Sequence, residues 1–338
     1  MRVHGVVERY LDMGRDRVRL RFAGASLAEA LLPAFGPRAT ADDGGPPAAS
    51  IDLWEEALVP GGHAPVPWSD HDLGPRGLLR GPAGCGMHAV HEGSGTVTLV
   101  DKAARTIRYR VPSTEALPWW ERAAPMRPAL FWALAGNGRH LVHAGAVGDE
   151  RGGILLVGAG GSGKTTMALA ALMAGLRYVG DDYLLITTNS GPQALNVFAT
   201  AKLDEGHVER FPELAAQARR IGPTESEPDE KLVLDVPSAC PGALTAALTL
   251  RAVAVPRITG GTTAVRATSA GNALLALAPS TVMQMPYDGG ATLAPLGRLL
   301  RPLPSFAVDV GDDRDGLAAA LDEVLERATG PSRLVATS

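Results

Sequence analysis

Hydrophobic and polar positions give the first third of the chain a different texture from the rest. Two stretches with alternating apolar and polar residues, TVTLVD and TIRYRVP, predict a β-hairpin near 96–111. Residues 33–86 are interrupted by proline and glycine, which predicts only short strands and loops. The stretch from about 117 to 136 has helical spacing, and two prolines inside it predict a break or a second start.

From residue 140 onward, strand and helix signals alternate. The runs HLVHAGAVG and GGILLVG each predict one short apolar strand, and TTMALAALMAGL predicts a helix that ends near Gly175. RYVGDDYLLIT predicts two short strands on either side of an aspartate pair, and ALTAALTLRAVAVPRI predicts one or two buried strands. Further helices are predicted at 268–278, 292–302 and 312–328. This alternation is typical of an α/β or α+β domain with a nucleotide-type core.

The composition is that of a folded protein and narrows the choice of partners. The chain has 338 residues, enough for one large domain or two ordinary ones. Its net charge of −4 gives no general attraction to nucleic acid or to anionic lipid. Cys85 and Cys240 are the two cysteines, which excludes a disulfide framework. Because all five tryptophans precede residue 140, we expect a β-rich N-terminal domain at 1–139 and a second domain at 140–330.

Targeting signals are not recognised in the sequence. The N-terminus carries charges throughout and lacks an apolar core followed by a small-residue cleavage site. No window approaches about 18 uninterrupted apolar residues, the length that a membrane-spanning helix needs. We therefore expect a cytoplasmic protein.

A glycine-rich motif carries the clearest chemical signal. Residues 158–165 read GAGGSGKT and match the phosphate-binding pattern G-x-x-x-x-G-K-[ST], between a predicted strand and a predicted helix. Glycine lets backbone N–H groups approach phosphate oxygens, the lysine supplies a point charge, and the threonine hydroxyl can bind Mg²⁺. We expect the following residues to bind the phosphates of a nucleotide: Gly158, Ala159, Gly160, Gly161, Ser162, Gly163, Lys164, Thr165 and Thr166.

Two further elements flank this motif. Asp181 and Asp182 follow the strand that is predicted after the helix of the glycine-rich motif. We therefore expect the pair to return beside the loop on a neighbouring strand. Adjacent side chains point to opposite sides of a strand, so one carboxylate can face metal and phosphates; a solvated turn is the alternative. His143 lies on the apolar strand before the loop, where a structural core histidine and an active-site residue are both open readings. A zinc site at Cys85, His88 and His91 is a weaker alternative.

Taken together, His143, the loop 158–165 and the pair Asp181-Asp182 resemble the catalytic core of HPr kinase/phosphorylase. The resemblance extends to related serine kinases, including those that tailor lasso-peptide precursors. It is specific over about 140–187 and loose from there to about 328. It implies a P-loop kinase core with a mixed sheet, related to phosphoenolpyruvate carboxykinase, and it implies ATP and Mg²⁺ as cofactors. Closed oligomers among the relatives make a homo-oligomer a further expectation.

The resemblance also implies roles for individual residues. Lys164 would neutralise phosphate and Thr165 would bind Mg²⁺. Asp182 would accept the proton of the attacking hydroxyl, and Asp181 would support the metal or the transferred phosphoryl group. His143 would be an active-site residue near the phosphates. These roles suit phosphoryl transfer, which depends mainly on positioning and charge neutralisation.

The chain departs from the bifunctional enzyme because the glutamate-containing signature after the aspartates, and a later arginine, cannot be placed. Several acidic residues are open candidates for a second metal ligand: Asp204, Glu205 and Glu209. Several basic residues are open candidates for a phosphate-binding cation: Lys202, Lys231, Arg251 and Arg257. Among the cations we favour Lys231, because the strand predicted after it could carry it inward.

These observations lead to one main functional expectation. The chain is expected to be an ATP- and Mg²⁺-dependent kinase acting on a serine hydroxyl of a peptide or small protein, by resemblance a lasso-type precursor peptide. An HPr-type kinase/phosphorylase, a small-molecule kinase and a non-catalytic ATP-binding regulatory protein are the alternatives. The domain at 1–139 is expected to bind the peptide, and neither nucleic acid nor a membrane is expected as a partner.

Overall fold

The computed structural model divides the chain into two compact units. It describes residues 5–14, 16–41, 44–58, 72, 74, 77–80, 89–93, 95–136, 138–187, 191–222, 230–284 and 290–330. Unit 1 comprises Met1–Leu141, Asn196–Pro241 and Gln284–Asp288, and unit 2 comprises Val142–Leu195, Gly242–Met283 and Gly289–Ser338. The segment 196–241 thus belongs to unit 1, whereas the expected ranges 1–139 and 140–330 place it in the second domain. No helix within the described ranges is long and apolar enough to cross a membrane.

Unit 1 is built on a sheet in which the strands follow the order β3-β1-β2-β4-β8-β7-β6-β5. The predicted hairpin is confirmed, because β7 and β8 pair antiparallel. Burial alternates along β4, so one face of the sheet is packed and the other is partly exposed. The strands have these bounds: β1 (Val6–Met13), β2 (Asp16–Ala23), β3 (Ala39–Thr40), β4 (Ala49–Glu55), β5 (Leu78–Arg80), β6 (Ala89–Gly93), β7 (Thr96–Asp101) and β8 (Thr106–Val111).

Short helices complete unit 1. The predicted break in the helical stretch after residue 117 is confirmed: α2 (Trp119–Ala123) and α3 (Arg127–Leu134) are separated by Met126, whose φ is +57°. The buried carboxylate of Glu121 accepts the Met126 N–H at 2.7 Å, which holds this turn. The other elements are α1 (Ser26–Leu31), η1 (Leu32–Arg38), η2 (Glu56–Leu58), β15 (Thr200–Leu203), α5 (Glu205–Arg210), α6 (Pro212–Ala215), β16 (Leu232–Asp235) and α7 (Val236–Ala239).

Unit 2 contains a mixed sheet, as the resemblance implies. The order is β12-β10-β11-β17-β14-β13-β9, with β19 also paired to β17 and β18 paired to β19. The long strand β17 pairs parallel with β11 and β19 and antiparallel with β14. The strands have these bounds: β9 (Arg139–His143), β10 (Gly145–Asp149), β11 (Gly152–Leu156), β12 (Arg177–Gly180), β13 (Tyr183–Thr187), β14 (Gln193–Asn196), β17 (Ala247–Ile258), β18 (Ala264–Thr268) and β19 (Ser305–Val310).

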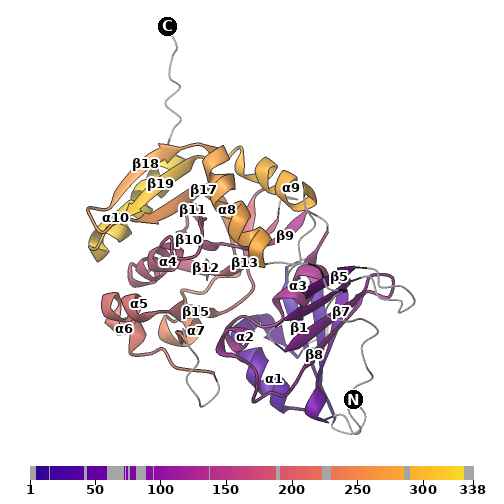
Figure 1. Ribbon diagram of the computed structural model, residues 1–338. Helices are drawn as coiled ribbons and strands as arrows, with labels where there is room; N and C mark the ends of the chain where they lie inside the picture. The colour runs from indigo at the N-terminus through magenta and orange to yellow at the C-terminus, as the bar shows by residue number, and fades with distance from the viewer. Residues whose placement is uncertain are drawn as a thin grey trace. The chain divides into compact units, whose positions relative to one another are not determined.

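Helices cover both faces of this sheet (Figure 1). On one face, Leu155 and Val253 share a buried apolar cluster with Leu277 of α8 (Ala270–Gln284) and Leu300 of α9 (Gly290–Leu300). On the other face, α4 (Lys164–Met173) and α10 (Arg314–Thr329) pack against each other and against the strands. Alternation of side chains along β11 and β17 supplies apolar residues to both layers.

Two expectations about these elements need adjustment. The run HLVHAGAVG forms two strands, β9 and β10, and not one. The strand is interrupted at Ala144, and β9 and β10 pair with different strands of the sheet. The helix predicted at 268–278 continues to Gln284. The end of α4 is as predicted: Gly175 follows the helix with φ +75°, and the Leu176 N–H donates to Ala171 O at 2.9 Å, which is a Schellman end.

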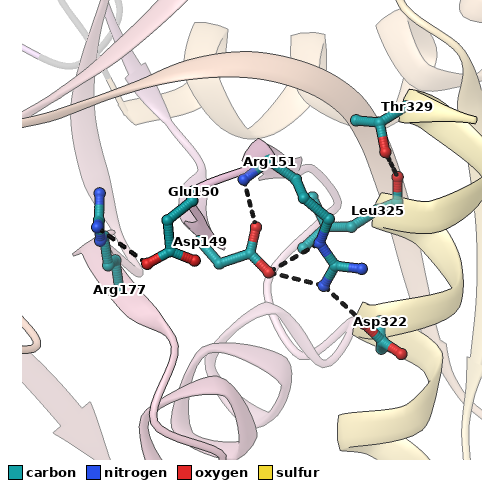
Figure 2. Close-up of polar contacts among 7 residues, drawn as sticks. All are labelled: Asp149, Glu150, Arg151, Arg177, Asp322, Leu325 and Thr329. Carbon is teal, nitrogen blue, oxygen red and sulfur yellow. Dashed lines mark hydrogen bonds and ion pairs between the residues drawn. The ribbon is translucent and has the colours of Figure 1, made fainter.

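A polar cluster ties α10 to the turn between β10 and β11 (Figure 2). The Arg151 guanidinium donates to Asp149 at 2.6 and 2.9 Å and to Asp322 of α10 at 2.6 Å. A second pair, Arg177 with Glu150 at 3.2 Å, lies beside it and is much more exposed. Arg151 therefore bridges an element on one side of the unit 2 sheet to the turn at the sheet's end.

Candidate functional site

The strand registers of unit 2 bring three segments to one edge of the sheet. Gly145 lies opposite Leu156, the last residue of β11, and Ala146 lies opposite Gly180, the last residue of β12. Because β10 runs antiparallel to both strands, its beginning meets both of their ends. The loop 158–165, His143 and the aspartate pair all continue from this edge. The expectation that the aspartates return on the strand next to the loop is wrong, because β10 lies between; the spacing of two strands is about 10 Å.

The loop 158–165 connects β11 to α4 and has a conformation that requires glycine. Gly161 and Gly163 have φ of +76° and +105°, a region that residues with a Cβ rarely adopt. A Cβ on Gly158 would lie 2.3 Å from Ser162 Oγ. Gly163 is also the N-cap of α4, so the loop ends at the positive end of a helix. This strand–loop–helix arrangement is the setting that a phosphate-binding loop requires.

Lys164 is buried at the start of α4 and its ammonium is held across the loop. Its Nζ donates to Gly158 O at 2.8 Å and to Ala159 O at 3.0 Å. The Ser162 Oγ is buried, with no hydrogen-bond partner among the described residues. A lysine, a buried hydroxyl and loop amides at a helix N-terminus together make a donor set that fits a phosphate group. Thr165 is partly exposed in the first turn, whereas Thr166 is buried.

Asp181 is fixed by a buried tyrosine. Its side chain is 3 % exposed in relative terms, and its Oδ1 accepts a hydrogen bond from Tyr178 Oη at 3.0 Å. Burial, and then the negative charges of Asp181 and Asp182, raise the pKa of the Tyr178 phenol well above its ordinary value. The phenol therefore stays protonated and remains a donor, which holds Asp181 in one orientation.

Asp182 has a different partner. Its Oδ1 lies 2.7 Å from Nε2 of His143, whose side chain is almost fully buried. The imidazole also lies against the Tyr183 ring, with a centroid distance of 5.3 Å. The backbone N–H of His143 donates to Thr281 Oγ1 of α8 at 3.2 Å. The histidine is therefore positioned from three sides, and one of its nitrogens faces the second aspartate.

Gly145 permits the close approach of these segments. A Cβ at this position would lie 3.2 Å from both Asp181 Cα and Gly180 O. Any larger residue would have to push the aspartate turn away from the start of β10. The glycine in HAGAVG therefore sets the spacing between the histidine segment and the aspartates.

Three supporting residues were not identified from the sequence. Tyr178 lies three positions before Asp181, and an aromatic residue at this spacing from a paired carboxylate could have been considered. Gly145 lies two positions after His143, and its closeness in sequence to a candidate residue is a signal that could have been considered. Thr281 is distant in sequence, and no local pattern marks it.

The remaining candidates have local contacts of their own. In unit 1, Asp204 caps α5 and lies 2.7 Å from His207 and 3.5 Å from Lys231, and Lys202 lies over the Trp119 ring. Glu205 and Glu209 are on α5, and Arg251 and Arg257 are exposed on β17 of unit 2. No group of three or more His, Cys, Asp and Glu side chains that could hold a metal is found in the described part of the chain. The side chains of Cys85, His88 and His91 lie outside the described residues.

Comparisons with known proteins add little. No family model matches the chain, and no curated protein matches it. A solved structure that it resembles is the Hpr(Ser) kinase/phosphatase from Coxiella burnetii, with a TM-score of 0.31 and 14 % sequence identity over 54 % of this chain and 95 % of that chain. A likeness at this level carries no functional argument.

Proposed function

We propose that this protein transfers the γ-phosphoryl group of ATP, with Mg²⁺, to a serine hydroxyl of a peptide or small protein. One observation carries the proposal: the loop 158–165 and the His143–Asp182 pair lie at the same edge of the unit 2 sheet. A phosphate cradle and, at the same edge of the sheet, a carboxylate that can accept a proton are the minimum that phosphoryl transfer to an alcohol needs.

The donor side of the reaction would use the glycine-rich loop. The backbone amides and Ser162 Oγ would bind the phosphates, and Lys164 would exchange the carbonyl oxygens of Gly158 and Ala159 for phosphate oxygens. Thr165 and Asp181 would hold Mg²⁺, which when bound offsets the negative charge of the phosphates. Tyr178 would keep Asp181 oriented for this task.

The acceptor side would use Asp182 as the base. The Nδ1 of His143 is buried and has no hydrogen-bond partner among the described residues, which is compatible with a tautomer that carries its proton on Nε2. An Nε2–H donor would orient the Asp182 carboxylate and leave its other oxygen to accept the hydroxyl proton. In this arrangement His143 positions the base and does not itself take the proton.

The proposed substrate class comes from the resemblance of His143, the loop 158–165 and the pair Asp181-Asp182 to serine kinases that tailor precursor peptides. That resemblance favours a ribosomal precursor peptide of the lasso type. The test is to incubate the full chain with ATP, Mg²⁺ and candidate serine-containing precursor peptides, and to measure by mass spectrometry the mass added by one phosphoryl group. Asp182→Asn protein is the matched control, since it should bind ATP without transfer. Retained ATP binding with no transfer to any serine peptide would contradict the proposal and favour a nucleotide-sensing role.

A further inference from the structure

We propose that the outer edge of β1 in unit 1 binds an extended peptide as an added strand. The proposal rests on the proposed function in one respect, namely that the bound peptide is a segment of the phosphoryl acceptor. The occupant is a stretch of peptide backbone with small apolar side chains at alternate positions. The argument uses the orientation of backbone groups along β1, the short length of β3 and a groove beside the open part of the edge.

Alternate backbone groups of β1 face away from its partner β2. The carbonyl oxygens of Glu8, Tyr10 and Asp12 all accept hydrogen bonds from side chains and not from β2. Their donors are Arg9 Nη1 at 2.8 Å, Thr40 Oγ1 at 3.5 Å and Arg38 Nη1 at 2.9 Å, respectively. Because backbone groups alternate along an antiparallel strand, the N–H groups of these same residues also face outward.

Within the described residues, another strand covers only half of this edge. β3 pairs with Tyr10 and Leu11 and extends no further along β1. The first half of β1, Val6–Arg9, has β2 on one side, and no strand in the described part of the chain pairs with its other side. The outward N–H of Glu8 has no hydrogen-bond partner among the described residues. An exposed edge of this kind is a template for strand addition.

A groove of about 530 Å³ lies where β3 stops. β1 forms one wall, and the helical segment α1–η1 forms the other. An added strand that continues the line of β3 would place alternate side chains in this groove, because successive residues point to opposite faces. The apolar part of the groove lining has a small area, which suits short side chains on the added strand. The apolar lining residues are Val7, Ala25, Ala28, Leu32, Pro33 and Ala39.

The groove favours a neutral, extended occupant. Its charged lining residues are Arg9 and Glu29, one of each sign, so it offers no net charge to a strongly acidic or basic segment. The Arg9 guanidinium covers the Glu8 carbonyl, and an incoming peptide N–H would replace it as the donor. The pairing would continue the β1–β3 ladder that already occupies the other half of the edge.

A matched pair of variants tests the backbone contact. Glu8→Ala keeps the outward N–H, and Glu8→Pro removes it; both lose the same side-chain contacts with Tyr10 and Arg21. Proline is tolerated at an edge when the missing N–H faces outward, so the β1–β2 pairing is retained. Short peptides would be selected from a randomised display library on the immobilised full chain, and the best binder would be measured by fluorescence anisotropy without ATP.

We expect Glu8→Ala to bind this peptide within about twofold of the unaltered protein and Glu8→Pro to bind it at least tenfold more weakly, roughly the effect of one lost hydrogen bond. Equal affinity of the two variants would overturn the proposal, as would a selection that yields no binder that distinguishes them. If Glu8→Pro unfolds, a peptide that carries N-methyl groups on alternate backbone amides takes the place of this variant in the test. Methylation of one alternate set of amides (one parity) should abolish binding, and methylation of the other set should not. Equal effects of both parities would also overturn the proposal.

Two further measurements separate this proposal from others. If light scattering shows a concentration-dependent dimer that Glu8→Pro abolishes, the occupant is a second copy of this chain and the peptide proposal is wrong. With a serine appended to the peptide, Glu8→Pro should raise KM and leave kcat unchanged. Peptide binding at the edge without any phosphorylation would contradict the proposed function alone, whereas phosphorylation with equal KM for both variants would contradict the edge proposal alone.

Discussion

Nε2 of His143 lies 2.7 Å from Oδ1 of Asp182, although the two residues come from segments separated by the whole glycine-rich loop and helix α4. Removing the charge of the carboxylate tests its role as the base. Asp182→Asn should lower phosphoryl transfer by about 100-fold or more and leave ATP affinity nearly unchanged. Initial-rate kinetics and calorimetric ATP binding measure the two effects, with Asp322→Asn as a control carboxylate in the same unit. Near-normal transfer by Asp182→Asn would contradict the assignment.

The same pair can be examined by a double-mutant cycle. His143→Gln should lower transfer, and combining it with Asp182→Asn should add little further loss, because the histidine acts through the aspartate. Full additivity of the two losses in the logarithm of kcat would show that His143 acts independently of Asp182.

Lys164 gives a prediction for the donor side. Lys164→Ala should abolish transfer and weaken ATP binding by at least about tenfold, because the ammonium is the buried cation of the loop. The variant also loses two hydrogen bonds to the carbonyls of Gly158 and Ala159, so thermal unfolding must be measured alongside. Unchanged ATP affinity in a folded Lys164→Ala protein would argue against a phosphate site at this loop.

Gly145 tests whether the spacing between the histidine segment and the aspartate turn matters. Gly145→Ala should lower transfer by about tenfold with a smaller effect on ATP affinity, because the added Cβ would displace the aspartate turn by a few tenths of an ångström. Gly271→Ala on α8 is the control, since a Cβ there makes only ordinary contact with Ser269 Oγ at 3.6 Å. Equal kinetics for both variants would remove the role given to Gly145.

Tyr178 tests the support of Asp181. The Tyr178→Phe substitution removes only the hydroxyl that donates to Asp181. It should raise the Mg²⁺ concentration needed for half-maximal transfer by about tenfold, because Asp181 loses the group that orients it. Tyr10→Phe in unit 1 removes a hydroxyl of the same kind from Glu8 and should not change the Mg²⁺ dependence. A Tyr178→Phe protein with lower stability but an unchanged Mg²⁺ dependence would assign the tyrosine a structural role only.

The bridge between the β10–β11 turn and α10 gives a prediction of stability and its pH dependence. Arg151→Met should lower the free energy of unfolding by about 1 kcal/mol, whereas the exposed control Arg177→Met should have almost no effect. Burial alone would raise the pKa of Asp149, but the hydrogen bonds and charge of Arg151 outweigh it, so the net pKa is lowered.

The sign of the pH dependence follows from that lowered pKa. The pair's contribution is fully present above the ordinary aspartate pKa of about 4 and is lost as the pH falls through the lower pKa of the folded state. The difference in unfolding free energy between Arg151→Met and the unaltered protein should therefore shrink below about pH 4. Urea unfolding at several pH values measures it, and a difference that grows on acidification would contradict the assignment.

Local patterns were sufficient for much of unit 2. Strict apolar spacing predicted α4, and the glycine after it ends the helix as expected. Strands on both sides of the aspartate pair were also predicted correctly. By contrast, the hairpin β1–β2 was not predicted, because its arginines alternate with buried residues and give a weak apolar signal.

The sequence by itself determined the glycine-rich loop, its strand and helix, and the residue types that can bind phosphate and accept a proton, because these depend on neighbours along the chain. Only the tertiary structure decided that β10 lies between the loop strand and the aspartate strand, that His143 reaches Asp182, and that Tyr178 and Thr281 hold the site. Strand order and side-chain pairing depend on contacts between segments far apart in sequence, and a single sequence carries no local signal for those contacts.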